Sequence, residues 1–283
     1  MSCSMRIKFS KMSGAGNDFV VLGPEYSSLA GRASALARRL CHRRASVGAD
    51  GLVMVEVSDG IFMRYHNSDG SEAAFCGNGA RCFVLYCRLK GIAEGEIEFR
   101  TRSGRHRGAV VSDGVSVSMP PPVLERELTL KVSGAAYDIL LVMAGVPHAV
   151  LLLEPGHMPD VLTVGRAIRS DSAFGKEGAN VDFVTRTTNG GFAIRTYERG
   201  VEGETLACGS GCVAAAQVLK LKDLAGDEVN LGVASGDTLR VSLPQGERED
   251  AFLIGPAALV FEGSLDLDLE AFTPDEAKEQ EHV

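Results

Sequence analysis

The sequence predicts an α/β (α+β) protein of two pseudo-symmetric lobes, and three observations support this class. The chain matches itself at an offset of about 130 residues. Each half holds short β-branched stretches separated by Gly, Asp and Ser turns. Each half also contains one helix-favouring segment that is apolar on nearly every side. We therefore expect each lobe to wrap strands around one buried central helix.

Four blocks of sequence recur in the same order, which predicts the domain boundaries. The matched pairs are 12–22 with 143–152, 48–56 with 178–186, 65–79 with 197–211, and 98–104 with 230–236. The proline cluster Pro120–Pro122 is a natural linker between the copies. We expect an N-terminal lobe at 1–122, a C-terminal lobe at 123–256, a final strand near 257–270 that returns to the first lobe, and an acidic, flexible tail at 271–283.

Local patterns place the elements of each lobe. Strands are expected where β-branched residues cluster between turn residues, at 51–56, 97–101, 108–119, 192–198 and 237–243. Helices are expected directly after Cys76 and Cys208, at 77–91 and 209–222. Each cysteine should therefore lie where a glycine-rich loop meets the N-terminus of a buried helix.

Composition narrows the class of protein. Residues 262–283 hold eight acids and one lysine, and so account for seven of the eight net negative charges. Nothing basic or rich in aromatic residues indicates a nucleic-acid partner. The most apolar region, Ile139–Leu153, is interrupted by glycine, proline and histidine, so we expect no membrane span. The first residues lack the apolar region of a signal peptide, which predicts a cytoplasmic protein.

The seven cysteines argue against a disulfide framework, because their number is odd and no export signal precedes them. None of their spacings is CxxC and no His cluster accompanies them, so no metal is expected. Most of these cysteines are expected simply to pack; these are Cys3, Cys41, Cys82, Cys87 and Cys212. Cys76 and Cys208 differ because the repeat places both at equivalent helix starts.

A helix N-terminus favours negative charge at both cysteines. Its N–H groups and dipole should lower the thiol pKa and can hold a substrate carboxylate beside the sulfur. If the lobes face each other, two thiols flank one carbon. A thiolate can then remove a proton from one face while a thiol delivers one to the other, which is the chemistry of racemisation. Both helix starts would stabilise the enolate-like intermediate.

Other readings of the same residues stay open. A Cys–His hydrolase with His148 as base is conceivable, although it leaves the second cysteine unexplained. A non-enzymatic thiol redox or metal-binding protein is the other alternative.

Three segments carry a resemblance to a known family: "NSDGSEAAFCGNGAR" at 67–81, "ERGVEGETLACGSG" at 198–211 and "GAGNDFVVL" at 14–22. Together they resemble the diaminopimelate epimerase family. The resemblance implies two lobes of mixed, curled sheet or barrel around central helices, with the active site in the cleft between them. It also implies epimerisation of LL-2,6-diaminopimelate to the meso form, for lysine and peptidoglycan precursor biosynthesis. The implied enzyme needs no cofactor, neither pyridoxal phosphate nor metal, and is a homodimer.

The same resemblance implies a set of site residues. The catalytic pair would be Cys76 and Cys208, assisted by His148 and Glu198, of which Glu198 also contacts substrate. The distal amino-acid end of the substrate would bind Asn17, Asn67, Asn180 and Arg199. The α-carboxylate would bind Gly77, Asn78, Gly209 and Ser210.

Two positions depart from the family pattern. Val146 stands where many members have Asn before "PH", and Gly51 stands where some have Gln. We expect backbone or water to cover Gly51. Val146 removes a polar contact near the stereocentre, so a racemase of another amino acid with the same fold is the alternative.

Overall fold

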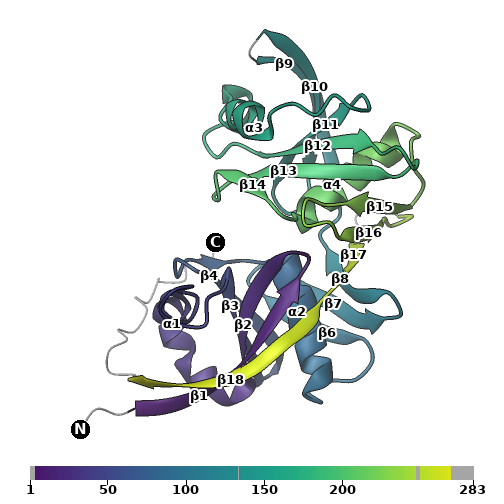
Figure 1. Ribbon diagram of the computed structural model, residues 1–283. Coiled ribbons are helices and arrows are strands. Elements are labelled where there is room, and N and C mark those ends of the chain that lie inside the picture. Colours follow the sequence, from purple (N-terminus) through teal and green to yellow (C-terminus); the bar gives the residue numbers. More distant parts are fainter. Residues whose placement is uncertain (1–3, 133, 247–248, 269–283) are drawn as a thin grey trace, which may run out of the picture. The chain divides into compact units, whose positions relative to one another are not determined.

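The computed structural model describes residues 4–132, 134–246 and 249–268, and the predicted tail at 271–283 lies outside them. The chain forms two compact units: the first runs to Arg107 and resumes at Ala257, and the second is Gly108–Pro256. Each unit consists of strands around a helix (Figure 1), which confirms the predicted α/β class. No helix within these described ranges is long and apolar enough to cross a membrane.

The first unit is a mixed sheet with helices on it. Its elements are β1 (Ser4–Gly14), β2 (Asn17–Leu22), η1 (Pro24–Arg32), α1 (Ala33–Leu40), β3 (Gly51–Ser58), β4 (Gly60–Asn67), β5 (Glu72–Ala73), α2 (Gly77–Leu89), β6 (Ile97–Thr101) and β18 (Ala258–Asp268). β1 pairs antiparallel with β2 and β18, β2 runs parallel to β3, β3 pairs antiparallel with β4, and β4 runs parallel to β6. β7 (Gly104–Val111) crosses the boundary between the units.

Helix α2 is buried over most of its length, as its apolar sequence predicts. Cys82, Phe83, Val84 and Cys87 are all fully buried along it. Burying a side chain such as Phe83 contributes about 1.5–3 kcal/mol. The helix start is thereby held firmly against the sheet.

The second unit has the same kind of architecture. Its elements are β8 (Gly114–Met119), β9 (Val123–Val132), β10 (Ala135–Met143), β11 (Pro147–Leu153), α3 (Val161–Arg169), η2 (Ser172–Phe174), β12 (Asn180–Arg186), β13 (Phe192–Glu198), β14 (Gly203–Thr205), α4 (Gly209–Leu221), β15 (Glu228–Gly232), β16 (Thr238–Ser242) and β17 (Ala251–Gly255). Strands β9, β10 and β11 form an antiparallel meander, and β17 pairs with β8. Helix α4 is buried, with Cys212 and Val213 fully enclosed.

The strand pairings of the first unit recur in the second in the same order. β11 runs parallel to β12 as β2 does to β3, and β12 pairs antiparallel with β13 as β3 does with β4. β13 then runs parallel to β15 as β4 does to β6. Helices α2 and α4 begin at residues 77 and 209, which is the offset of the sequence repeat. The duplicated sequence therefore forms a duplicated fold.

Candidate active site

Cys76 caps the N-terminus of α2, directly after the hairpin of β4 and β5. Its backbone is extended, with φ −143° and ψ 112°. The Gly79 N–H donates to Cys76 Sγ at 3.4 Å, and the Ala80 N–H donates to the Cys76 carbonyl at 2.8 Å. The sulfur thus lies at the positive end of the helix dipole.

Asn78, in the first turn of α2, is 4% exposed and reaches β2. Its Nδ2 donates to Asn17 Oδ1 at 2.6 Å, and Asn17 Nδ2 donates to Asp50 Oδ2 at 2.9 Å. Arg43 in turn binds Asp50 at 2.6 Å and Asp18 at 2.7 Å. The network brings together Asn17 and Asn78, two of the predicted substrate contacts.

Asn67, the last residue of β4, is held at both ends of its amide. Its Oδ1 accepts from the Tyr65 hydroxyl at 3.0 Å, and its Nδ2 donates to Ser71 Oγ at 3.0 Å. The Tyr65 ring lies over Gly51, where an added Cβ would be 2.4 Å from Tyr65 Cε2. The Tyr65 side chain thus fills the space over Gly51 together with the His66 carbonyl oxygen, which an added Cβ would meet at 2.8 Å.

Cys208 occupies the equivalent N-cap position of α4, and is 7% exposed whereas Cys76 is only half-buried. Its Sγ lies 3.5 Å from Ser210 Oγ in the first helical turn. Ser210 Oγ also lies 3.0 Å from His148 Nε2. A chain of polar contacts therefore joins the sulfur to the histidine on β11.

The far side of His148 faces Asp182 on β12, and both side chains are fully buried. His148 Nδ1 lies 2.7 Å from Asp182 Oδ2, and Thr196 Oγ1 donates to Asp182 Oδ1 at 2.7 Å. A carboxylate only accepts hydrogen bonds, so His148 Nδ1 carries the proton. In the neutral ring, Nε2 is then the acceptor that faces Ser210.

The remaining predicted residues of this unit lie around β13 and β12. Asn180 Nδ2 lies 3.3 Å from His148 Nε2, and Asn180 Oδ1 accepts from the Arg199 N–H at 2.8 Å. No hydrogen bond or ion pair holds the Arg199 guanidinium within the part of the chain that the structure describes, so the cation is available to a ligand carboxylate. Burial raises the pKa of the Glu198 carboxyl above its ordinary value.

The expected fall in thiol pKa is wrong for Cys208. Burial raises the pKa of this thiol well above its ordinary value, and the charges of Glu198 and Asp182 act in the same direction. Ser210 and the Gly211 N–H oppose the rise without outweighing it. A helix N-terminus contributes about 0.3–1 kcal/mol, which is under one pKa unit, whereas full burial can shift a pKa by about 3–5 units.

Sequence reasoning missed Asp182, Thr196, Asp50 and Tyr65. Asp182 left a detectable signal, because it is an acid within the otherwise apolar strand "NVDFV". A buried acid in such a strand needs a partner, which here is His148. Thr196 and Asp50 left no local signal, because their partners Asp182 and Asn17 lie on other strands.

The other described cysteines pack in the core. Cys41, Cys82, Cys87 and Cys212 are buried, and burial raises the pKa of Cys41, Cys82 and Cys87 to about 12 each. Across the described ranges, no group of three or more His, Cys, Asp and Glu side chains is arranged to hold a metal ion.

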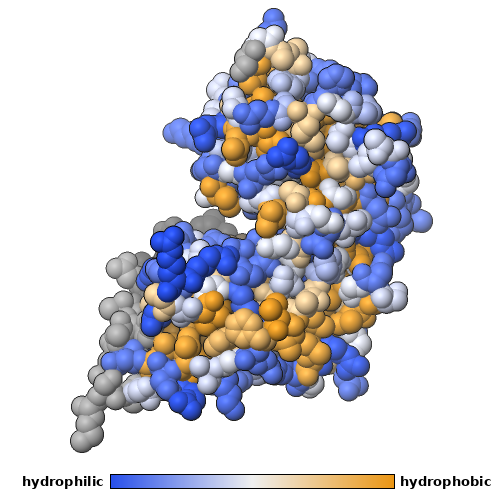
Figure 2. All heavy atoms as spheres, in the orientation of Figure 1, coloured by the Kyte–Doolittle hydropathy of each residue, from blue (hydrophilic) through white to orange (hydrophobic). Residues whose placement is uncertain are grey.

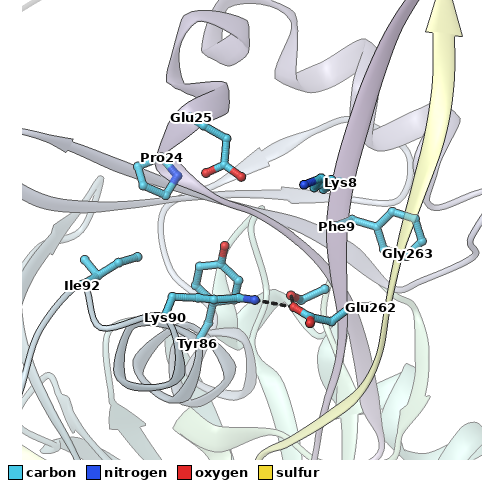
Figure 3. Close-up of a pocket in the computed structure, with 10 residues that line it drawn as sticks. Lys8, Phe9, Pro24, Glu25, Tyr86, Lys90, Ile92, Glu262 and Gly263 are labelled. Atoms are coloured by element: carbon cyan, nitrogen blue, oxygen red, sulfur yellow. Dashed lines mark hydrogen bonds and ion pairs between the residues drawn. The ribbon is translucent and has the colours of Figure 1, made fainter.

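A cavity of about 430 Å³ lies elsewhere in the first unit, between β1, β18, η1 and the end of α2 (Figure 3). Lys8, Glu25 and Tyr86 border it, and Lys90 forms an ion pair with Glu262 at its edge. None of the predicted site residues lines this cavity.

Comparisons with solved structures place the fold. A hydroxyproline epimerase from Agrobacterium vitis superposes with a TM-score of 0.72 at 15% identity, covering 95% of this chain and 94% of that one. A phenazine biosynthesis PhzF family protein from Enterococcus faecalis gives a TM-score of 0.71 at 13% identity, covering 93% and 100%. At such identities the likeness concerns the fold alone.

Comparisons with sequences give the family. A diaminopimelate epimerase from Methanocella arvoryzae is 38% identical over 285 residues, covering 94% of this chain and 99% of that protein. One from Aquifex aeolicus is 37% identical, covering 92% and 98%. The family model named diaminopimelate epimerase matches residues 9–125 and 140–260. Two of its helices begin at equivalent cysteines, and these matches show that the chain belongs to the diaminopimelate epimerase family.

Proposed function

We propose that the protein is an isomerase that epimerises LL-2,6-diaminopimelate to meso-diaminopimelate by proton transfer between two cysteines. The observation that carries this is the pair of helix starts, with Cys76 capping α2 and Cys208 capping α4 at the offset of the repeat. Two equivalent sulfurs are what a reaction with interchangeable acid and base requires.

In this mechanism one cysteine, as thiolate, removes the α-hydrogen while the other, as thiol, protonates the opposite face of the same carbon. Each sulfur ends in the other's protonation state. The raised pKa of Cys208 favours its thiol form before substrate binds. The first-turn N–H groups at Gly77, Asn78, Gly209 and Ser210 bind the α-carboxylate and stabilise its enolate-like charge.

His148 and Glu198 assist at the reacting centre. The His148 ring is fixed in orientation by Asp182 and touches Ser210, which in turn touches Cys208. Through this chain the ring can respond to the charge on the sulfur. Burial raises the pKa of the Glu198 carboxyl, so that it is a weaker acid than an exposed glutamate.

The distal amino-acid end binds Asn17, Asn67, Asn180 and Arg199. The available guanidinium of Arg199 suits a carboxylate, which it can bind through two parallel N–H bonds. The three amides offer both donors and acceptors, as an end bearing ammonium and carboxylate groups requires.

The proposal extends to the pathway, the cofactor requirement and the location of the enzyme. The enzyme acts in lysine and peptidoglycan precursor biosynthesis, uses neither pyridoxal phosphate nor metal, and works in the cytoplasm, where its thiols stay reduced.

We also propose a homodimer that forms through the first unit. Leu259, Val260 and Phe261 on β18 are each at least 40% exposed, and β18 pairs with β1 alone among the described strands. Figure 2 shows apolar side chains gathered along this part of the unit. Exposed apolar strands of this kind mark association surfaces. Light scattering of the purified protein tests the dimer, and Phe261→Lys should yield monomers.

The test of the reaction is incubation of the reduced protein with LL-diaminopimelate in deuterated buffer. We expect deuterium at the α-carbon together with meso product, and no meso product in Cys76→Ala or Cys208→Ala. Absence of both label and product with the reduced wild-type protein would contradict the proposal.

A racemase of another amino acid is the second candidate, and Val146 favours it. This side chain precedes Pro147 and His148 and offers no hydrogen bond where relatives often carry an amide. Exchange on a different amino acid in a substrate panel, without exchange on diaminopimelate, would select this candidate. A thiol redox or metal-binding role would instead show stoichiometric zinc in elemental analysis or a functional disulfide.

A further inference from the structure

Tyr65 combines a packed ring with a directed hydroxyl. The residue is 8% exposed on β4, and its ring meets Phe19 edge-on with centroids 6.0 Å apart. Gly51 pairs with Asn67 across β3 and β4, and any side chain there would clash with this ring, since an added Cβ would be 2.8 Å from the Tyr65 hydroxyl oxygen. The absence of a side chain at Gly51 therefore lets the tyrosine lie over the strand.

The hydroxyl donates into a directional chain of hydrogen bonds. Tyr65 donates to Asn67 Oδ1 at 3.0 Å, Asn67 Nδ2 donates to Ser71 Oγ at 3.0 Å, and Ser71 Oγ donates to Asp69 Oδ1 at 2.6 Å. The Ser71 hydroxyl, followed by the Ser71 N–H, lowers the pKa of Asp69, which keeps the last acceptor charged. A carboxylate at one end fixes the direction of every donor, and hence which end of the Asn67 amide is oxygen.

We propose that Tyr65 is the positioning residue of Asn67, and that with Gly51 it sets recognition of the substrate's distal amino-acid end. This rests on the proposed function, in which Asn67 contacts that end. The amide keeps a second N–H and a second lone pair beyond the bonds to Tyr65 and Ser71. Their directions are fixed by those bonds, so a zwitterionic end meets a prearranged donor and acceptor.

The repeat supplies a matched control. Tyr197 lies at the offset of 132 from Tyr65 and is fully buried, but its hydroxyl lies 3.4 Å from Glu202 Oε2 on a surface turn. Tyr65→Phe and Tyr197→Phe each keep the ring and remove one hydroxyl. A role in packing alone would make the two variants behave alike.

The kinetic test compares both variants in the conversion of LL-diaminopimelate. Tyr65→Phe should raise KM about 3- to 10-fold, as expected for one neutral hydrogen bond, with kcat nearly unchanged. Tyr197→Phe should leave both constants at the wild-type values. Gly51→Ala should also raise KM by displacing the ring, and adding it to Tyr65→Phe should give less than the product of the two effects. An unchanged KM in Tyr65→Phe would overturn the inference while the proposed function stands.

A second readout does not depend on epimerase activity. The side-chain amide resonances of Asn67 in NMR spectra should shift in Tyr65→Phe and stay in place in Tyr197→Phe. Failure of the wild-type protein to epimerise would remove the proposed function, yet these resonances would still report the positioning. Unshifted Asn67 resonances in Tyr65→Phe would overturn it.

Discussion

At the start of α2 the polar network is made of carboxylates and cations, whereas at the start of α4 it is made of a histidine and a carboxylate. In the first unit Asp18 binds Lys11 at 2.6 Å and Arg43 at 2.7 Å. At the corresponding strands of the second unit, His148 pairs with Asp182 in full burial. The repeated backbone thus fixes where each sulfur and its N–H groups lie, while the strand residues decide the charge that surrounds them.

The two networks therefore contact different parts of the proposed site. Asp18 forms ion pairs with Lys11 and Arg43, and Arg43 also binds Asp50, which accepts from Asn17 beside Asn78 at the start of α2. The histidine network of the second unit reaches Cys208 through Ser210. We infer that the first network positions Asn17 and Asn78, whereas the second reaches the sulfur of Cys208.

The largest expected effect concerns the cysteine that caps each of the two helices, α2 and α4. Cys76→Ala and Cys208→Ala should each lower kcat by at least about 10²- to 10⁴-fold, because either change removes one of the two proton carriers. Cys82→Ala, in the core of α2, should lower stability with kcat within a few-fold. A steady-state assay of the three variants measures this. Substantial turnover by either single-site variant would show that the two starts are not equivalent in function.

The second-largest expected effect concerns the buried His148–Asp182 pair, which is found only near the start of α4. Asp182→Asn should lower kcat about 10- to 100-fold, since an amide can donate to His148 Nδ1 and thereby favour the wrong tautomer. Nitrogen-15 NMR of the His148 ring reports the tautomer directly. Asp138→Asn, at an exposed residue of the same unit, should leave kcat unchanged. A wild-type tautomer in the Asp182→Asn protein would show that Asp182 does not fix the tautomer of His148.

Reactivity of the two thiols should also differ in the free protein. Cys76 is half-buried, whereas Cys208 is only 7% exposed. This burial raises the pKa of the Cys208 thiol. Iodoacetamide should therefore label Cys76 at least about 10-fold faster than Cys208, because only the accessible thiolate reacts. Peptide mass spectrometry over time measures both rates. Equal rates would mean that burial does not separate the two sulfurs.

A smaller difference is expected between the third residues of the two helices, Gly79 in α2 and Gly211 in α4. A Cβ at Gly211 would be 2.4 Å from Asp182 Oδ1, whereas one at Gly79 would have Met63 Cε as its nearest neighbour at 3.3 Å. Gly211→Ala should cost about 1–3 kcal/mol of unfolding free energy through overpacking. Gly79→Ala should cost less, because a methionine end can move. Denaturant unfolding of both variants checks the order, and a larger loss at Gly79 would reverse the comparison.

The smallest effect is the acid dependence of the first network. Burial alone would raise the pKa of Asp18, but hydrogen bonds from Arg43 and Lys11 outweigh it and lower the pKa to about 2. A lowered pKa stabilises the folded state above the ordinary value near 3.8, and this contribution, up to about 2 kcal/mol, is lost as pH falls towards 2. Unfolding free energies between pH 5 and pH 2 should fall more steeply in the wild type than in Asp18→Asn. Parallel curves would exclude Asp18 as the group responsible.

Much of the fold could be predicted because its signals are local. Glycine-rich turns followed by apolar helix formers located α2 and α4, and β-branched stretches located β3, β6 and β13. Strand β9, with its exposed and charged residues, showed no such pattern, and neither did the short helix α1. The site was predictable only as far as the residues adjacent to the cysteines and the family motifs extend.

The sequence by itself determined that two cysteines cap equivalent buried helices in a duplicated α/β chain, because hydrophobic period, glycine placement and the repeat are all written along the chain. Only the tertiary structure decided that Asp182 faces His148, that Tyr65 covers Gly51, and that Cys208 is too buried for the helix dipole to lower its pKa. These depend on strand register and on solvent exclusion. Both arise from contacts between residues distant in sequence, so neither is encoded in any single stretch.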